Sequence, residues 1–293
     1  MSDKKIRKKA FAKINLGLDV LGKRADGYHE VKMIMQSVNL YDELEFMLED
    51  PSTAKERITL LSNDKTMPLG EENLVYKAAR LLMDEFQVMA PVRIHIQKNI
   101  PMAAGMAGGS SDCAATLKGI NELFDLKLSL EELLVRGKLL GADVPYCLMG
   151  GTCLSEGIGE ILTRLPDAPQ SVVVLAKPEE GVSTKEVYQA LDAGENEEHP
   201  DIDGMVLAIK NQNKEEMIAR LGNVLEKVTI PRCKKVAAIK DCLKQSGADG
   251  VLMSGSGPTV FGLFEEKKAA EEAVSALNEQ GFAKDIIVTE FCR

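Results

Sequence analysis

PMAAGMAGGSSD, residues 101–112, is the stretch that decides how the rest of the chain is interpreted. It follows a segment in which Val92, Ile94 and Ile96 alternate with other residues, and it precedes apolar residues at helical spacing between 114 and 124. This order predicts a strand, a glycine-rich turn and the start of a helix. Glycines let the backbone approach an anion closely, and the free N–H groups and the dipole of a helix start attract one. The stretch is therefore consistent with a phosphate-binding loop, and equally with a glycine-rich turn that binds nothing.

Composition and charge describe an ordinary globular chain. Its 293 residues are 45% hydrophobic and 28% charged, which suits two domains of roughly 100 to 200 residues each. The net charge is −9, and basic residues cluster only near the start of the chain, so a surface for nucleic acid or anionic membrane is disfavoured. No apolar run has the length of a signal-peptide core or of a membrane span. We expect a cytoplasmic protein, monomeric or homodimeric, with no nucleic-acid or membrane partner.

Several common motifs are absent from the sequence. The six cysteines form no C-x-x-C pair and there are only three histidines, so no zinc pattern is present and reduced thiols are expected. The central loop lacks the lysine of G-x-x-x-x-G-K-[ST], and no complete G-x-G-x-x-G, H-R-D or D-F-G occurs. P-loop, dinucleotide-binding and protein-kinase motifs are thereby excluded. Any phosphate site is of another kind.

A strand is predicted at residues 10–20, AFAKINLGLDV, because apolar residues alternate there with polar residues or glycine. Lys13 and Asn15 lie on the polar face, two residues apart. A cation and an amide that project side by side can hold a phosphate and a substrate oxygen. A half-buried strand with a wet face has the same pattern, so this alternative stays open.

Four further residues could contact a ligand, and each also has a purely structural explanation. Tyr28 and His29 follow an Asp-Gly turn, where such residues are usually just exposed. Lys98 ends a strand before the glycine loop, so it could meet the phosphates or ribose of a nucleotide, or be a solvated strand end. Asp143 lies in a turn that Pro145 terminates. It could form an Asx turn or an N-cap, or accept a hydrogen bond from a substrate hydroxyl.

The order of predicted elements indicates an α+β fold. Strands are predicted at 10–20, 31–35, 44–48, 92–97, 171–176, 251–253, 259–264 and 286–291. Helices are predicted from Asn73, from the Ser110, Ser111 and Asp112 caps, and over 129–140, 183–191, 215–228, 234–245 and 267–279. The acidic stretch from Asp192 to Asp203 is predicted to be a loop. We expect one domain at 1–165 and, at 166–293, a ferredoxin-like α+β sandwich with a helical insert.

Three separated segments resemble the three motifs of one enzyme family, the GHMP small-molecule kinases. They are the lysine-bearing strand at 12–18, the P-x-x-x-G-x-x-G-G-S-S loop at 101–111 and the late glycine turn at 253–259. The ordered triple is far more specific than a single glycine loop. AKINLGLDVLGKRADGYHEV and GADVPYCLMGG further resemble the members of this family that phosphorylate a cytidine diphosphate-linked methylerythritol.

This resemblance implies the two-domain GHMP kinase fold, with a ribosomal-protein-S5-like domain followed by the ferredoxin-like domain. It implies that ATP and Mg²⁺ bind at the loop and that the substrate binds in a cleft between the domains. The γ-phosphoryl group would be transferred to the 2-hydroxyl of the methylerythritol, in non-mevalonate isoprenoid biosynthesis. The alternatives are another GHMP kinase, acting on mevalonate, homoserine or a sugar, and a nucleotide-binding homologue without turnover.

The resemblance also implies roles for individual residues. Asp143 matches the catalytic base and Lys13 the catalytic lysine, which would stabilise the transferring phosphoryl group and keep Asp143 ionised. Asn15 and His29 match substrate contacts, Tyr28 matches the aromatic that stacks on cytosine, and Tyr188 is a second aromatic wall. The residues implied to bind ATP are Lys98, Pro101, Ala103, Ala104, Gly105, Met106, Ala107, Gly108, Gly109, Ser110 and Ser111.

Two details of the loop lead to further expectations. Ala103, Ala104 and Ala107 stand where some family members carry glycine. Since alanine does not adopt positive φ cheaply, negative φ is expected at these positions. Ser110 could reach the Mg²⁺ ion, and no acidic residue is marked by its spacing as a second ligand.

Overall fold

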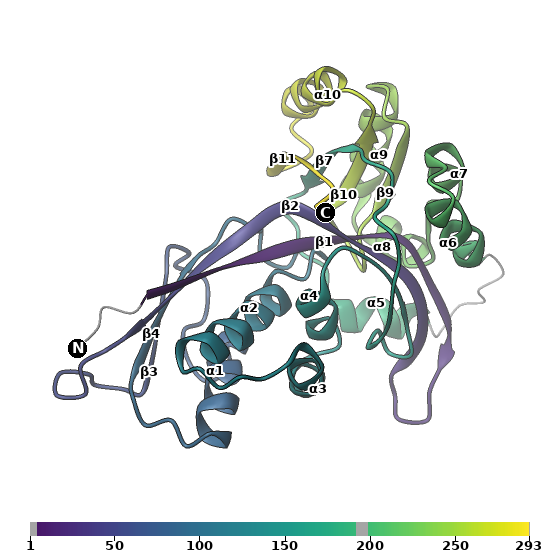
Figure 1. The fold of residues 1–293 in the computed structure, drawn as a ribbon. Coiled ribbons are helices and arrows are strands. Elements are labelled where there is room, and N and C mark those ends of the chain that lie inside the picture. The colour runs from purple at the N-terminus through teal and green to yellow at the C-terminus, as the bar shows by residue number, and fades with distance from the viewer. Residues whose placement is uncertain (1–4, 192–198, 293) are drawn as a thin grey trace. The chain divides into compact units, whose positions relative to one another are not determined.

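The computed structural model describes residues 5–191 and 199–292, and the chain divides into two compact units that interleave along the sequence. Unit 1 consists of Met1–Ala12, Leu40–Ile100 and Ala107–Met149. Unit 2 consists of Lys13–Asn39, Pro101–Met106 and Gly150–Arg293. Figure 1 shows the long strands β1 (Lys5–Lys23) and β2 (His29–Leu48). Each of them contributes residues to both units. The mixture of sheets and helices confirms the predicted α+β class, and the predicted boundary at 165 lies within unit 2.

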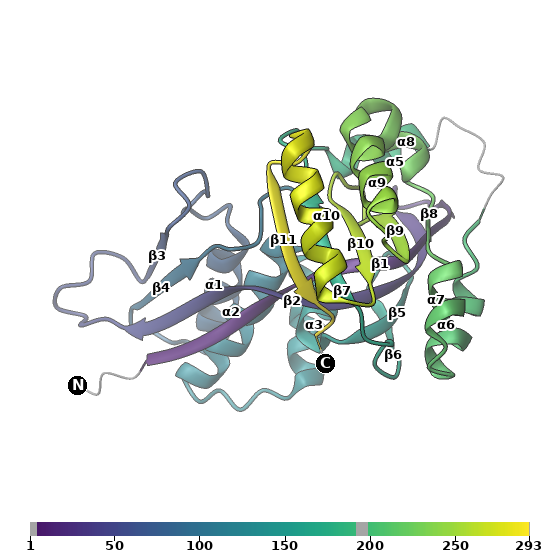
Figure 2. The same cartoon turned by 90° about the horizontal axis from the view of Figure 1, so that it is seen from above.

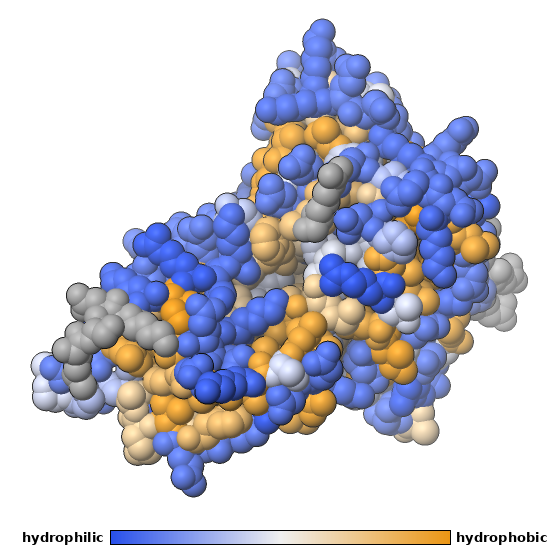
Figure 3. All heavy atoms as spheres, viewed as in Figure 1, coloured by the Kyte–Doolittle hydropathy of each residue, from blue (hydrophilic) through white to orange (hydrophobic). Residues whose placement is uncertain are grey.

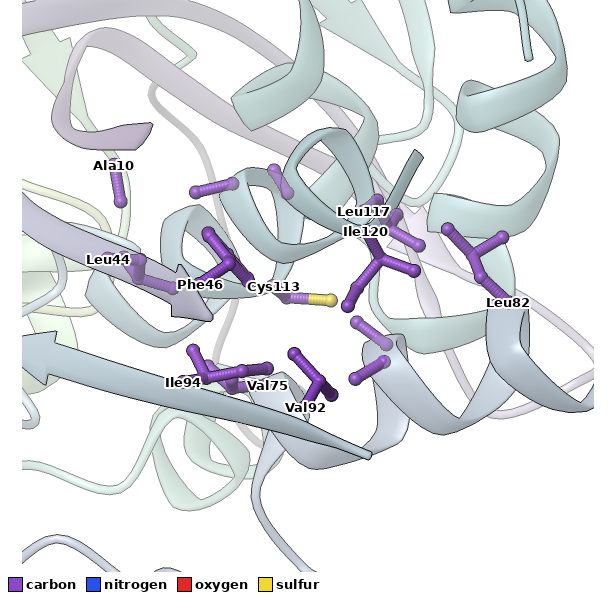
Figure 4. Close-up of a cluster of buried hydrophobic side chains, with 14 of the residues drawn as sticks. Ala10, Leu44, Phe46, Val75, Leu82, Val92, Ile94, Cys113, Leu117 and Ile120 are labelled. Carbon is purple, nitrogen blue, oxygen red and sulfur yellow. The ribbon is translucent and has the colours of Figure 1, made fainter. Parts of the chain in front are cut away.

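Unit 1 packs helices against a sheet. β3 (Ile58–Ser62) pairs in parallel with β4 (Val92–Gln97), which pairs antiparallel with the C-terminal part of β2. The helices of this unit are α1 (Leu74–Glu85), α2 (Gly108–Leu123), α3 (Leu130–Leu140) and α4 (Val144–Met149). Phe46 and Ile94 from the sheet and Cys113 and Leu117 from α2 belong to one buried cluster (Figure 4). The alternating apolar residues of β4 therefore contribute to the sheet side of the core, together with residues of β2 and β3.

The predicted helix boundaries in unit 1 are largely confirmed. The side chain of Asn73 caps α1 by accepting the N–H of Val75, and Ser129 and Glu132 form the predicted capping box of α3. One detail differs, because Pro145 does not end a turn but lies in the first turn of the short helix α4. Proline is tolerated in a first helical turn, where its missing N–H is not needed.

Unit 2 contains the predicted ferredoxin-like sheet. Its strands are antiparallel in the order β11 (Asp285–Glu290), β7 (Val172–Lys177), β10 (Val260–Phe264) and β9 (Gly250–Met253). α9 (Lys234–Gln245) and α10 (Lys267–Gln280) lie side by side on this sheet (Figure 2). The outer side of α10 carries lysine and glutamate side chains and is hydrophilic (Figure 3). This polarity is expected of a helix that buries only one face.

The remaining described elements of unit 2 lie outside this four-stranded sheet. These elements are β5 (Thr152–Glu156), β6 (Ile161–Arg164), α5 (Thr184–Leu191), α6 (Ile202–Lys210), α7 (Lys214–Ala219), β8 (Gly222–Asn223) and α8 (Glu226–Arg232). β5 pairs with β2, and β8 pairs in parallel with β1. Within the described ranges, no helix has the length and apolar character needed to cross a membrane.

Three predictions about these elements were wrong. The strands expected at 31–35 and 44–48 are parts of the single strand β2. The helix expected over 215–228 is interrupted, because Gly222 and Asn223 pair with Gly17 and Leu18 of β1. The acidic loop ends earlier than expected, since Asp201 caps α6, while residues 192–198 lie outside the described ranges. Pairing with a distant strand overrides local helical periodicity here.

Gly119→Ala is expected to lower the free energy of unfolding by about 1 to 3 kcal/mol, the usual cost of overpacking a core. A Cβ at this position of α2 would lie 2.4 Å from the ring of Phe46, which is fully buried. Urea denaturation measures the change. Gly109→Ala at the start of the same helix is the control, because its nearest neighbour would be Leu74 at 4.0 Å and alanine favours a helix. Equal losses in the two variants would contradict the packing argument.

Candidate functional site

The side chains of Lys13 and Asn15 are in contact on β1. Nζ of Lys13 donates to Oδ1 of Asn15 at 2.7 Å and to the carbonyl oxygen of Gly105 at 3.2 Å. The two residues are 5% and 0% exposed, so the alternative of a wet strand face is wrong. Both described partners of this ammonium in unit 2 are neutral oxygens. They accept two of its three N–H groups without cancelling its charge, so the charge stays available to an anionic ligand.

Gly105 joins β1 to the late glycine turn. Besides the Lys13 ammonium, its carbonyl oxygen accepts the hydroxyl of Ser254 at 3.0 Å, and the N–H of Lys13 donates to the carbonyl of Met106 at 3.1 Å. The φ angle of Gly105 is +71°, and a Cβ here would lie 2.5 Å from the carbonyl oxygen of Ser254. Only glycine fits this position. Unit 2 thus brings together Lys13, Asn15, the first half of the loop and the late turn.

Buried polar side chains that the sequence did not single out support the late turn. Nδ2 of Asn223 donates to the carbonyl oxygens of Met253 and Gly255, each at 2.8 Å. The hydroxyl of Thr229 donates to the carbonyl of Ser256 at 3.0 Å. No local motif marks Asn223 or Thr229, because both reach the turn through the tertiary fold from β8 and α8.

The second half of the loop leads into α2 in unit 1. Ala107 precedes the helix with φ +57° and makes no side-chain cap, so the expectation that Ser110, Ser111 or Asp112 caps it was wrong. Instead, the hydroxyl of Ser111 donates to the carbonyl of Phe11 at 2.5 Å. The first N–H groups of a helix have no acceptor within it. This end of α2 can therefore bind an anion, as the phosphate-loop interpretation requires.

The expected negative φ in the loop is wrong at two of the three alanines. Ala103 has φ +50° and Ala107 has φ +57°. A left-handed conformation costs an alanine roughly 1 to 2 kcal/mol. The surrounding structure, rather than the local preference of these residues, therefore sets the shape of the loop.

Lys98 is buried in unit 1, so it is not a solvated strand end. Its side chain is 5% exposed, and its ammonium binds the carboxylates of Asp42 and, at 2.7 Å, Asp112. Burial acts to lower the pKa of Lys98, but Asp112 and Asp42 together raise it above its ordinary value. Burial acts to raise the pKa of Asp112, the charge of Lys98 opposes this rise, and Asp42 adds to it. A contact between Lys98 and a nucleotide stays a prediction.

Asp143 lies in unit 1, in the turn between α3 and α4, and is half-buried. Its backbone carbonyl accepts the N–H of Cys147 at 3.0 Å, which fixes the turn. Its carboxylate accepts no hydrogen bond from the described residues of unit 1, so its side chain forms neither an Asx turn nor a helix cap there. The carboxylate can therefore accept a hydrogen bond from a ligand.

His29 and Tyr188 form an aromatic pair in unit 2. Their ring centroids are 4.9 Å apart and their planes are inclined at 40°. Tyr28 beside them is 59% exposed. Tyr188 belongs to α5, whose first residue, Thr184, is hydrogen-bonded to Ser256 of the late turn at 2.8 Å. Aromatic rings arranged beside an exposed tyrosine can stack on a planar base.

Comparison with family models identifies two matching segments. Residues 73–151 match the GHMP kinases N terminal domain, and residues 205–283 match GHMP kinases C terminal. A 4-diphosphocytidyl-2-C-methyl-D-erythritol kinase of Lachnoclostridium phytofermentans is 51% identical over 283 residues, covering 97% of this chain and 96% of that protein. The protein of the same name from Lachnospira eligens is 48% identical, covering 97% of this chain and 98% of its own.

Solved structures show the same relationship. A crystal structure of 4-(cytidine 5'-diphospho)-2C-methyl-D-erythritol kinase is 30% identical with a TM-score of 0.82, covering 98% of this chain and 100% of that one. A homoserine kinase from Cytophaga hutchinsonii matches with a TM-score of 0.75 and 21% identity, covering 99% of this chain and 94% of that one. This second likeness is evidence for the fold alone.

Gly105→Ala is expected to destabilise the protein by about 1 to 3 kcal/mol more than Gly247→Ala. Both glycines have positive φ, +71° and +82°, but a Cβ at Gly105 would meet backbone atoms, whereas nothing lies within 4 Å of one at Gly247. The shared backbone strain therefore cancels in the comparison, and the remaining difference reports the contact between the loop and the late turn. Thermal denaturation of both variants measures it. Equal losses of stability would show that the close approach at Gly105 is unimportant.

Proposed function

Because this chain belongs to the GHMP kinase family, in the branch of the 4-diphosphocytidyl-2-C-methyl-D-erythritol kinases, we propose that it phosphorylates 4-diphosphocytidyl-2-C-methyl-D-erythritol with ATP. The alcohol oxygen at position 2 forms a bond to the γ-phosphorus, the β–γ phosphoanhydride bond breaks, and ADP leaves. The reaction is a step of non-mevalonate isoprenoid biosynthesis. The observation that carries the proposal is the buried Lys13 ammonium, held by Asn15 and by the loop carbonyl of Gly105.

Lys13 has the properties needed to stabilise a phosphoryl group in transfer. The negative charge of this transition state lies on the phosphoryl oxygens, so fixed cations and N–H groups stabilise it most. The ammonium of Lys13 is positioned by two hydrogen bonds and is removed from water. The N–H groups at the start of α2 are assigned to the phosphates of ATP.

Asp143 is assigned as the base. Its carboxylate would accept a hydrogen bond from the 2-hydroxyl, orient this oxygen towards the γ-phosphorus and take its proton as the new bond forms. The open hydrogen-bonding capacity of Asp143 within unit 1 supports this role. Asn15 is assigned to a substrate oxygen.

Mg²⁺ is proposed as the cofactor that accompanies ATP, with Ser110 as a ligand. Ser110 is half-buried in the first turn of α2, and its hydroxyl makes no hydrogen bond to the described residues of unit 1. Mg²⁺ prefers oxygen ligands and is commonly held by one or two protein groups together with nucleotide phosphates. When bound, the ion neutralises charge on the phosphates of ATP.

The aromatic residues Tyr28, His29 and Tyr188 are assigned to the cytosine base. A stacked base supplies binding energy remote from the reacting hydroxyl, and this energy can position the hydroxyl for transfer. The pair of rings formed by His29 and Tyr188 supports this assignment.

Asp143→Asn is expected to reduce kcat by about 10² to 10⁴, the usual contribution of a general base, while the Kd for Mg-ATP is unchanged. Release of ADP is measured with the cytidylylated alcohol and, separately, with mevalonate, homoserine and galactose. Asp241→Asn is the control, because Asp241 is an exposed carboxylate on α9. Turnover on another alcohol alone would identify a different GHMP kinase, and nucleotide binding without turnover would indicate a non-catalytic homologue.

Tyr188→Ala is expected to raise KM for the cytidylylated substrate by about tenfold, within the ~1 to 3 kcal/mol range of a stacked base. KM for ATP is expected to be unchanged, because the substitution removes only a ring assigned to cytosine. Steady-state kinetics with each substrate varied in turn separates the two effects. Tyr188→Phe keeps the ring and is expected to behave as the wild type. A wild-type KM in the alanine variant would remove Tyr188 from the base site.

A further inference from the structure

We propose that Lys98, Asp42 and Asp112 form a clamp that holds both ends of the glycine-rich loop and thereby sets the affinity for ATP. The inference rests on the proposed function, since it concerns the loop assigned to the phosphates. It gives Lys98 a positioning role in place of a direct contact with the nucleotide.

The clamp fixes the start of the loop through Asp42. Oδ1 of Asp42 accepts the N–H groups of Asn99 at 2.6 Å and Ile100 at 2.8 Å, the two residues that precede Pro101. Its other oxygen binds the ammonium of Lys98. Asp42 is fully buried. One carboxylate on β2 therefore fixes both the backbone before the loop and the cation beside it.

The clamp fixes the end of the loop through Asp112. This residue lies in the first part of α2, and its Oδ2 accepts the Lys98 ammonium at 2.7 Å. The same ammonium lies directly beside the helix start, since a Cβ on Gly108 would be 3.5 Å from Nζ of Lys98 and 3.1 Å from Cγ2 of Ile100. A single buried ammonium thus connects the residues before the loop with the helix after it.

The loop between these fixed ends is strained. Ala103, Gly105 and Ala107 all have positive φ, and two of them carry side chains. Strained backbone persists only where the surroundings determine it. The clamp supplies such a constraint within unit 1, because separating α2 from the residues before the loop would break ion pairs in a buried place. Loss of one member of a buried ion pair leaves the other charge without compensation.

A double-mutant cycle tests the clamp. The variants are Lys98→Met, Asp112→Asn and the combination of both, and Asp112→Asn is nearly isosteric with the wild type. Affinity for Mg-ATP is measured by calorimetry, and hydrogen exchange of the backbone N–H groups of residues 104–109 is measured without nucleotide. Arg136→Met is the matched control, because Arg136 pairs with Glu85 between α3 and α1 in the same unit, away from the loop.

Each single variant is expected to bind Mg-ATP about tenfold more weakly, equivalent to ~1.4 kcal/mol, and to exchange faster at residues 104–109. The double variant is expected to be no weaker than Lys98→Met, because the two residues act through one interaction. KM for the cytidylylated substrate and the properties of Arg136→Met are expected to be unchanged.

Three results would overturn the clamp. Wild-type affinity and exchange in Asp112→Asn, together with weak binding in Lys98→Met, would make Lys98 a direct ligand of the nucleotide. Additive losses in the double variant would exclude a shared interaction. Equal losses in Arg136→Met would mean that general destabilisation is the cause. If the wild type bound no Mg-ATP, the proposed function would fail, whereas exchange of the loop N–H groups would still decide whether the clamp orders the loop.

Discussion

The conformation of Gly105 is the constraint on which the candidate site depends. Its carbonyl oxygen is shared by the ammonium of Lys13 and the hydroxyl of Ser254, and its positive φ and close approach to the late turn leave no room for a side chain. The backbone therefore fixes the cation, which would otherwise move at the end of a flexible side chain. A charge held in place before the ligand arrives needs no reorganisation when negative charge develops beside it. The backbone of Gly105 thus positions the ammonium of Lys13, to which the chemistry is assigned.

The packed elements that flank the loop allow its backbone to remain strained. Ala103 and Ala107 adopt left-handed conformations that each cost roughly 1 to 2 kcal/mol. This cost can be borne because the elements that flank the loop, β4 and α2, share one buried hydrophobic cluster. In unit 1, α2 packs against the sheet so closely that Gly119 lies under the ring of Phe46. The helix that receives the loop is therefore rigid, and a strained backbone can end on it without relaxing.

Local sequence patterns predicted the parts of the fold that local interactions determine. Asn73 and the capping box of Ser129 act within one helical turn, and their helices begin where the sequence indicates. The prediction of one helix over 215–228 was wrong because Gly222 and Asn223 pair with β1, more than two hundred residues away in the sequence. The prediction of negative φ at Ala103 and Ala107 was wrong for the same reason, because the surrounding structure and not the preference of alanine sets these angles. In the site, the alternation of the strand at 10–20 singled out Lys13 and Asn15 as candidates. No local sequence pattern indicates that Asn223 and Thr229 contact the late glycine turn.

Lys13 and Lys98 show why residue type alone does not define an anion site. Both are buried lysines next to the glycine-rich loop in sequence or in space, and both were candidates for ligand contacts. The described partners of Lys13 in unit 2 are an amide oxygen and a carbonyl oxygen, so its positive charge remains uncompensated by them. Lys98 is paired with two carboxylates, which compensate its positive charge within unit 1. The net charge of −9 does not favour long-range attraction of a polyphosphate, so binding depends on local cations and N–H groups. Of the two lysines, Lys13 is the one whose described hydrogen-bond partners in unit 2 are neutral, so its charge can attract a phosphate.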